Sequence, residues 1–319
     1  MNWKIAYVLA ACAATLAAQT AEQPVVLVIE LENDVLYRGN VSDVNLLAKD
    51  PKPTTSANQA FLESVAIADV RAINGKPVKG LRSYRVRALP FRVNPTPGQP
   101  IADFDGGGLF MSMWHILLSD GTYVGSIYAQ GAPPSPDSVI VGGTGAFFGV
   151  TGVVGSMEIT PQRGASMSED PANRRIHGGG RSRTTFYLYP KSRPEVQVTP
   201  SGPAVFHADD FSLVTAAKPA RSGEWLILSA AGLGPTSPSI DPGKPFPPYV
   251  EGKVHLVTSP LEVTVGGNAA ELRNAIGWPG QANVYRVDFR VPEGTAAGVA
   301  NLGLSVAWIN GPEVKIPVR

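Results

Sequence analysis

Glycine and proline interrupt this chain at short intervals and limit the length of any helix. The sequence contains 34 glycines and 29 prolines among 319 residues. Both residues weaken a helix interior, whereas the turns between strands use them readily. Charged residues make up 17% and hydrophobic residues 44%, which excludes a coiled coil, a helical bundle and a disordered chain. We therefore predict an all-β protein, long enough for about two domains.

The net charge of the chain argues against nucleic acid as a partner. The formal net charge is +1, without the excess of positive charge expected of a nucleic-acid-binding protein.

Residues 1–20 are typical of an export signal peptide, because Lys4 precedes a short alanine-rich apolar stretch from Ile5 to Ala18. We expect its removal and an extracellular or periplasmic protein. The residues before Cys12, the only cysteine, are similar to a bacterial lipobox, and a lipid there would tether the chain to a membrane.

The pattern of apolar runs and turns predicts a single β domain over residues 24–190. Asn74–Gly75 and Asp120–Gly121 are hairpin signals between apolar runs. An antiparallel sheet of eight strands can close into a barrel, which removes exposed edges. Two polar segments, Asn40–Ala60 and Pro161–Gly180, interrupt the pattern and are either functional lids or surface additions. The expected strands are Val25–Leu31, Val65–Val70, Leu81–Leu89, Leu109–Leu118, Tyr123–Gln130, Ser138–Val141, Ala146–Ile159 and Arg183–Tyr189.

A second β domain is predicted for residues 212–319. Residues 191–211 contain three further prolines and are expected to form a stiff linker. Turns then recur at a spacing typical of a β-sandwich. The expected strands are Trp225–Ala230, Lys253–Val257, Leu261–Val265, Val284–Val291 and Leu302–Trp308.

A glycine-rich signature in the first domain is more specific than the strand pattern. The Asp120–Gly121 turn is followed by Gly125–Ser126 and then by the run Ser138–Phe148, which contains Gly-Gly-Thr-Gly-Ala-Phe-Phe. This combination resembles the allene oxide cyclase and dirigent families, which share one β-barrel fold. The resemblance covers about residues 108–189. It implies an eight-stranded barrel, a homotrimer formed through the barrel, and an internal pocket that positions a small apolar or phenolic ligand without a cofactor or metal.

The glycines of this signature also have a direct physical interpretation. Gly142, Gly143 and Gly145 predict a tight connection between two strands, since glycine permits close backbone approach. No helical pattern follows them, so a phosphate-binding loop is not expected. The four histidines are isolated from one another, and no metal site is predicted.

Glu30 is the candidate catalytic residue, because the resemblance directs attention to an acidic residue on the first strand. Alternation places Val26, Val28 and Glu30 on one face of that strand. If this face points inward, Glu30 is a buried carboxylate suited to proton transfer. The alternative is that Glu30 faces solvent beside Glu32.

Arginines and aromatic residues supply the candidate ligand contacts. Arg85 and Arg87 share one strand face, as do Arg181 and Arg183, and an inward arginine would bind a carboxylate-bearing substrate. A solvated outer face is the alternative, and the aromatic residues either line a pocket or fill the core. The candidate ligand-binding residues are Arg85, Arg87, Trp114, Tyr128, Arg183 and Tyr187.

The second domain carries its own motifs, in the runs Ala231–Thr236, Val263–Ala270 and Pro279–Pro292. They resemble an Ig-like, IPT/TIG-type C-terminal domain of secreted bacterial proteins, which implies a structural or interaction module. Two functions therefore stay open. The barrel binds a small compound and guides its cyclisation or coupling, as an isomerase or a dirigent-like protein, or the chain is a non-catalytic adhesion protein with a packed barrel. A void containing Glu30 or an arginine favours the first, and a fully packed interior favours the second.

Overall fold

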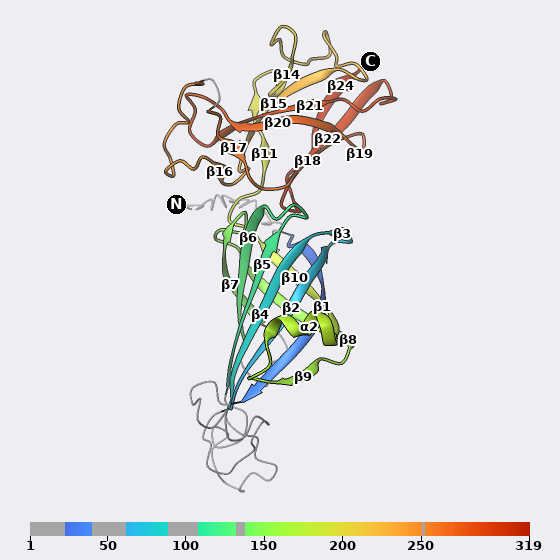
Figure 1. Ribbon diagram of the computed structural model, residues 1–319. Helices are drawn as coiled ribbons and strands as arrows, with labels where there is room; N and C mark the ends of the chain where they lie inside the picture. Colours follow the sequence, from blue (N-terminus) through green and yellow to red (C-terminus); the bar gives the residue numbers. More distant parts are fainter. Residues whose placement is uncertain (1–22, 40–61, 89–107, 132–137, 251–252) are drawn as a thin grey trace, which may run out of the picture.

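The computed structural model describes residues 23–39, 62–88, 108–131, 138–250 and 253–319 (Figure 1). Strands dominate these residues, and the helices among them are the short η2 (Pro171–Asn173) and α2 (Arg174–His177). The prediction of an all-β chain is confirmed. The expected signal peptide and the polar segment 40–60 lie outside the described residues.

Eight antiparallel strands close into a barrel, as predicted. Around the barrel they follow one another in chain order, and β1 completes the circle by pairing with β10 on one side and β2 on the other. The short β3 (Lys76–Pro77) returns from β2 at the Asn74–Gly75 turn. The barrel strands are β1 (Val25–Gly39), β2 (Leu62–Ile73), β4 (Lys79–Ala88), β5 (Gly108–Leu117), β6 (Tyr123–Gly131), β7 (Ser138–Gly145), β8 (Thr151–Thr160) and β10 (Gly180–Tyr189).

The glycine signature lies inside β7, and the connection to β8 begins after it. The predicted strand Ala146–Ile159 therefore starts later, at Thr151. A Cβ on Gly143 would lie 2.7 Å from the carbonyl oxygen of Ser126 and closer still to that of Phe147. The glycine is required here because two backbones approach each other, as expected. The predicted role of Gly142, Gly143 and Gly145 as a connection between two strands is wrong, because β7 continues through Gly145.

A β-bulge in β1 reverses which residues face the barrel interior. Before the bulge, Leu27, Ile29 and Leu31 are buried. The pairing of β1 with β2 then shifts between Glu32 and Val35, and Asn33 adopts a positive φ of 55°. Asparagine tolerates this conformation better than most residues. Because one residue is inserted into the alternation, the even-numbered positions of β1 turn inward after it.

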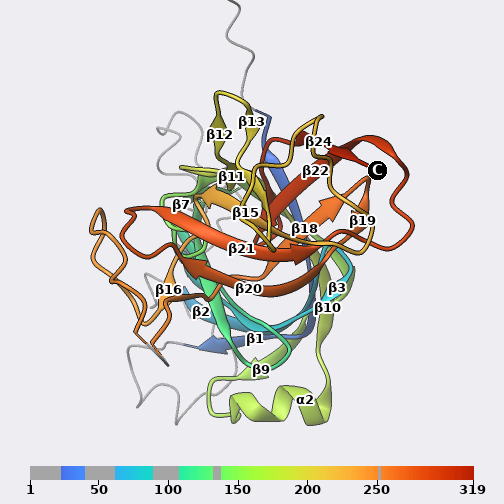
Figure 2. The same ribbon diagram turned by 90° about the horizontal axis from the view of Figure 1, so that it is seen from above.

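The segment between β8 and β10 packs outside the barrel wall (Figure 2). Its strand β9 (Arg163–Ser166) runs parallel to the end of β1, and α2 follows it. Asp69 on β2 accepts hydrogen bonds from Arg174 at 2.6 Å and Arg175 at 2.7 and 2.9 Å. The inserted segment is therefore fastened to the wall by a shared carboxylate.

Two sheets that share an apolar core make up the second domain. On β21, Tyr285, Val287 and Phe289 are buried and alternate with more polar residues, and Val263 and Leu302 of the other sheet are fully buried. One sheet contains β11 (Glu195–Val196), β14 (Val205–His207), β15 (Trp225–Ala231), β16 (Thr236–Ser237), β17 (Leu256–Val257), β20 (Glu271–Gly277) and β21 (Val284–Arg290). The other contains β18 (Leu261–Val265), β19 (Asn268–Ala269), β22 (Gly298–Val306), β23 (Ile309–Asn310) and β24 (Val314–Val318).

The predicted linker 191–211 needs correction, because most of it belongs to the second domain. Strand β11 pairs with the end of β15, and β14 pairs with its beginning. Between them, β12 (Val198–Thr199) and β13 (Gly202–Pro203) form a separate hairpin. The prolines in this region stand at turns and strand ends, so they do not indicate a free connection. The connection between the domains is correspondingly short, at residues 190–194.

The two domains are joined by more than this connection. Arg193 donates hydrogen bonds to the carbonyl oxygens of Gln23, at 2.6 Å, and Asn310, at 3.2 Å. Lys76 forms an ion pair of 2.5 Å with Glu262. The buried apolar residues of the barrel and the second domain form one continuous cluster.

Candidate functional site

The interior of the barrel has an apolar half and a polar half. In the half nearer the second domain, Leu27, Ile29, Phe186 and Leu188 are fully buried and fill the space. Beyond the bulge, polar and aromatic residues join the aliphatic ones on the inward faces of β1, β4 and β5. They include Asp34, Arg82, Tyr84 and Ser112. The candidate functional site is this polar half.

The strand register places Arg82 inside the barrel. Directly opposite residues in antiparallel strands point to the same face. Arg82 lies opposite Ala68 on β2 and Trp114 on β5, and Trp114 lies opposite Ile127 on β6. The three neighbours in this row are at most 3% exposed. An arginine therefore occupies a position of the interior wall between two tightly packed apolar residues.

Arg82 is paired with the acidic residue that the bulge turns inward. Its Nη2 donates a hydrogen bond to Oδ1 of Asp34. The side chains of the two residues are only 12% and 8% exposed. Gln162, at the start of the outer segment between β8 and β9, donates a second hydrogen bond of 2.6 Å to the same oxygen. Burial lowers the pKa of Arg82, and the charge of Asp34 opposes this effect. The guanidinium and the carboxylate together carry no net charge.

Two buried donors in this half have no partner among the described residues. They are Nε of Arg82 and Nε1 of the Trp114 indole. A buried N–H without an acceptor costs about 1–3 kcal/mol. Because Arg82 and Trp114 are direct neighbours across β4 and β5, both donors belong to one small region of the wall. An oxygen acceptor, from water or from a bound molecule, would satisfy them.

Aromatic rings continue this wall. Tyr84 stacks on Phe110, with ring centroids 5.6 Å apart, and the Arg82 guanidinium lies 5.6 Å from the Tyr84 ring centre. Burial raises the pKa of Tyr84 to about 12, against the lowering effect of Arg82, so its hydroxyl remains protonated at neutral pH. The site therefore combines one neutral ion pair, two unused donors and flat apolar surfaces.

Most of the residues proposed from sequence lie elsewhere. Trp114 is buried in the interior, where its ring packs edge-on against Phe186 with centroids 4.9 Å apart, a position that fits both the pocket and the core interpretation. Glu30 lies on the face opposite Ile29, outside the barrel, because the odd-numbered residues of β1 point inward before the bulge. Its expected inward position is not observed. Glu30 stands opposite Arg183 of β10 on that outer surface.

The remaining candidates also belong to the outer face or outside the described side chains. Arg85 and Arg183 are exposed, and Tyr187 is 45% exposed. Tyr128 alternates with the buried Ile127 and Ala129, so it is on the outside of β6. The side chain of Arg87 lies outside the described part of the structure. The site thus contains a first-strand acid and an arginine, but at Asp34 and Arg82.

Neither a metal centre nor a membrane helix is found in the described part of the chain. No cluster of three or more His, Cys, Asp or Glu residues there is arranged to hold a metal ion. None of the described helices is long and apolar enough to span a bilayer.

Comparison with known proteins gives little similarity. No protein-family model matches the chain, and no curated protein matches it. Among solved structures, a pyocyanin demethylase is similar over 52% of this chain and all of its own, with 15% identity and a TM-score of 0.26. Similarity of this size carries no information about chemistry.

Proposed function

We propose that the barrel binds a small apolar or phenolic compound in its polar half and orients it for cyclisation or coupling. The pair of unpartnered donors, Arg82 Nε and Trp114 Nε1, is the observation that supports this proposal. Buried polar groups in proteins are nearly always paired with protein, water or ligand. An oxygen of a bound compound would satisfy both donors and recover the cost of leaving them unpaired.

The charge balance of the site favours a neutral ligand with an oxygen at one end. Asp34 already compensates the Arg82 guanidinium, so a full negative charge on the ligand would have no free cation to pair with there. A phenol or carbonyl oxygen is sufficient as an acceptor. Tyr84 and Phe110 offer flat surfaces for the apolar remainder of the compound.

The chemistry proposed for the site is mainly positioning. A reactive compound held in one conformation between fixed groups loses the freedom that competes with ring closure or directed coupling. Asp34 is the proposed acceptor for a ligand hydroxyl proton, the role first considered for Glu30. The alternative, a non-catalytic adhesion protein, requires a packed barrel interior that binds no ligand.

Export of the protein remains part of this proposal. It rests on the apolar stretch Ile5–Ala18 after Lys4, and removal of residues 1–20 would release an extracellular or periplasmic protein. N-terminal sequencing of the exported chain tests it. A mature start at a lipidated Cys12 would instead tether the protein to a membrane.

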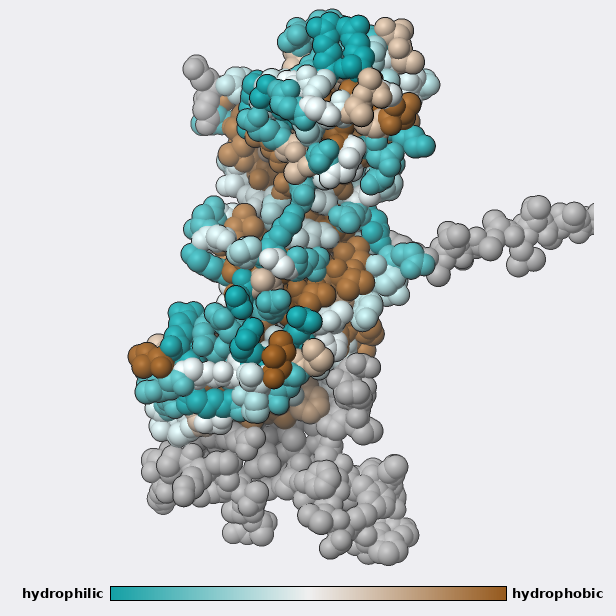
Figure 3. Space-filling view, turned by 90° about the vertical axis from the view of Figure 1, so that its right-hand side faces the viewer, coloured by the Kyte–Doolittle hydropathy of each residue, from teal (hydrophilic) through white to brown (hydrophobic). Residues whose placement is uncertain are grey.

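Self-association, as a homotrimer, is supported by an exposed apolar row on the outer wall. Val26, Tyr187, Val153 and Val139 are opposite one another across β1, β10, β8 and β7. They are 45%, 45%, 46% and 58% exposed, respectively. Hydrophobic side chains also gather on the barrel wall below the second domain in Figure 3. A contiguous apolar surface of this kind is typical of an interface.

Native mass spectrometry of the purified full-length chain tests the proposal first, by identifying a compound that copurifies with it. Titration with guaiacol, a neutral phenol, tests the site. Arg82→Met and Trp114→Phe each remove one unpartnered donor, and each should weaken binding about tenfold. Lys79→Met, an exposed charge on β4, is the matched control and should bind normally. Equal affinity of all four proteins for guaiacol would show that the polar half of the barrel is not the binding site.

A further inference from the structure

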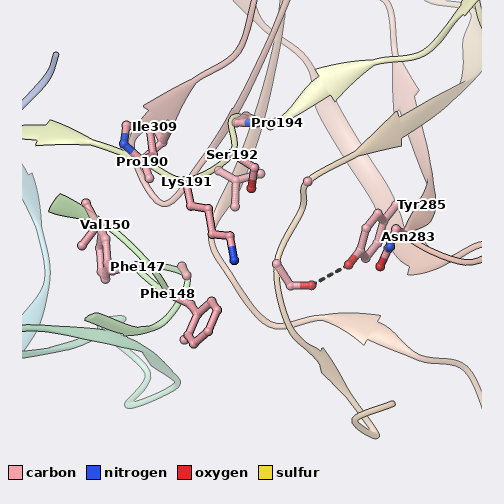
Figure 4. A pocket seen from close by; sticks show the side chains of 15 residues that line it. Phe147, Phe148, Val150, Pro190, Lys191, Ser192, Pro194, Asn283, Tyr285 and Ile309 are labelled. Carbon is pink, nitrogen blue, oxygen red and sulfur yellow. Dashed lines mark hydrogen bonds between the residues drawn. The ribbon is translucent and has the colours of Figure 1, made fainter. Parts of the chain in front are cut away.

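A cleft of about 390 Å³ lies at the junction of the barrel and the second domain (Figure 4). The turn after β7 forms one wall with Phe147 and Phe148, and Asn283 and Tyr285 form the opposite wall. Lys191, from the connection between the domains, extends between these walls. Small-molecule sites favour domain junctions and have volumes of about 300–1,000 Å³. The position and size of this cleft meet both conditions.

The lining of the cleft carries a single charged side chain. Among the residues that line it, Lys191 is positively charged, and none is an aspartate or glutamate. Within the described part of the chain, no carboxylate forms an ion pair with Lys191. The cleft therefore presents an uncompensated ammonium group, and a negatively charged guest complements it.

An exposed aromatic ring lies next to this ammonium group. Phe148 is 71% exposed, and the Lys191 Nζ is 5.6 Å from the centre of its ring. The backbone is shaped to allow this arrangement, because Gly149 has a positive φ of 74° and a Cβ there would lie 2.9 Å from the Lys191 side chain. A large ring that remains in water next to a cation is a suitable platform for a flat ligand.

Tyr285, on the opposite wall, contributes no charge to the cleft. Its hydroxyl donates a hydrogen bond of 2.7 Å to the carbonyl oxygen of Gly234, as Figure 4 shows. Burial raises the pKa of Tyr285, so the side chain stays neutral and keeps this bond. Recognition of a negative charge in the cleft therefore depends on Lys191.

We propose that this cleft is a second binding site, specific for small aromatic anions. The carboxylate or equivalent anion pairs with the Lys191 ammonium, and the ring of the ligand lies against Phe148. This site differs from the barrel interior in both place and charge preference. The barrel, with its neutral Arg82–Asp34 pair, is proposed to take neutral compounds, whereas the cleft takes negatively charged ones.

Calorimetric titration of the full-length chain tests this proposal with benzoate, cinnamate and 1-naphthoate as probes, and with cinnamamide as the neutral match to cinnamate. Lys191→Met keeps the length of the side chain and removes its charge, and Phe148→Ala removes the exposed ring. Each substitution should weaken binding of the anions about tenfold. Cinnamamide should bind the unmodified protein no more tightly than cinnamate binds Lys191→Met.

Two control variants locate the binding. Lys79→Met removes an exposed charge on the barrel and should leave anion affinity unchanged, and so should Arg82→Met. The proposal is overturned if none of the three anions binds at millimolar concentration, or if Lys191→Met binds them normally. It is also overturned if Arg82→Met alone abolishes binding while its circular dichroism spectrum shows that it is folded, since the anions would then occupy the barrel.

Discussion

Arg82 on β4 and Asp34 on β1 form a buried ion pair across the interior of the barrel. The two residues are 48 positions apart in sequence, and the strand β2 lies between their strands in the barrel. Their contact exists because the bulge at Asn33 turns Asp34 inward. One local irregularity in the first strand thus determines which charges the interior contains.

Breaking this pair from either side should destabilise the protein. Asp34→Asn and Arg82→Met each leave a buried charge without its partner, and each should lower the free energy of unfolding by about 3–5 kcal/mol. The double variant should lose less than the sum of the two, because it leaves no uncompensated charge. Urea unfolding of the four proteins measures these values.

The outer ion pair between Arg71 and Glu32 provides a matched control. Its side chains are 54% and 42% exposed, and the charged atoms are 3.9 Å apart. Glu32→Gln should change the free energy of unfolding by no more than about 0.5 kcal/mol. A similar loss from Glu32→Gln and Asp34→Asn would show that burial does not distinguish the two pairs.

Asp69 should make the attachment of the outer segment sensitive to acid. Burial alone would raise the pKa of Asp69, but hydrogen bonds from Arg175, Arg174 and Asn33 lower it to about 2 from its ordinary 3.8. Because the folded-state pKa is depressed, the stabilisation is complete above about pH 4 and is lost as the pH falls towards 2.

Unfolding of the unmodified protein and Asp69→Asn at several pH values checks this. The unmodified protein should be more stable near neutral pH by about 1–3 kcal/mol, and the difference should shrink below about pH 4. Limited proteolysis at neutral pH should cut residues 163–177 faster in the variant. A stability difference that is constant down to about pH 2 would contradict this role of Asp69.

The close approach at the glycine signature gives a third prediction. Gly143→Ala places a methyl group within 2.7 Å of the Ser126 carbonyl oxygen, so β6 and β7 cannot keep their spacing. We expect loss of several kcal/mol or failure to fold. Gly164→Ala, on β9, meets no atom within 4 Å and should be nearly neutral. Comparable melting temperatures for the two variants would rule out the steric explanation.

Much of the barrel could be predicted from sequence because its apolar face alternates and its hairpins carry clear turn residues. The strands around Asn74–Gly75 and Asp120–Gly121 are where the pattern placed them. The second domain was harder, since the prolines that suggested a linker instead mark turns and strand ends in the segment from β11 to β14. Proline restricts the backbone in both situations and does not distinguish them.

The site residues were harder to predict than the strands. Counting alternate residues from Val26 cannot foresee a bulge, although Asn33 between two acidic residues is a weak signal for one. On β4, arginines occur on both faces, at Arg82 and Arg85, so hydropathy does not reveal which face is inward. Only pairing with the buried Trp114 resolves it.

Self-association can be tested on the outer apolar row. Val153→Lys introduces a charge at its centre and should convert an oligomer into a monomer, because burying an unpaired ammonium opposes association. Val299 of β22, in the second domain, is 72% exposed, and Val299→Lys should leave the mass unchanged. Analytical ultracentrifugation measures both, and a monomeric unmodified protein would exclude the interface.

The most direct test of the barrel site is the nitrogen–proton spectrum of the Trp114 indole in the full-length chain. The resonance is assigned by its absence in Trp114→Phe, and the protein is then titrated with guaiacol. If the ligand oxygen accepts the hydrogen bond that Nε1 lacks, the Trp114 indole proton should move downfield as guaiacol binds, and Arg82→Met should reduce the shift at equal ligand concentration. A Trp114 resonance that stays fixed while guaiacol binds would contradict a ligand site in the polar half of the barrel.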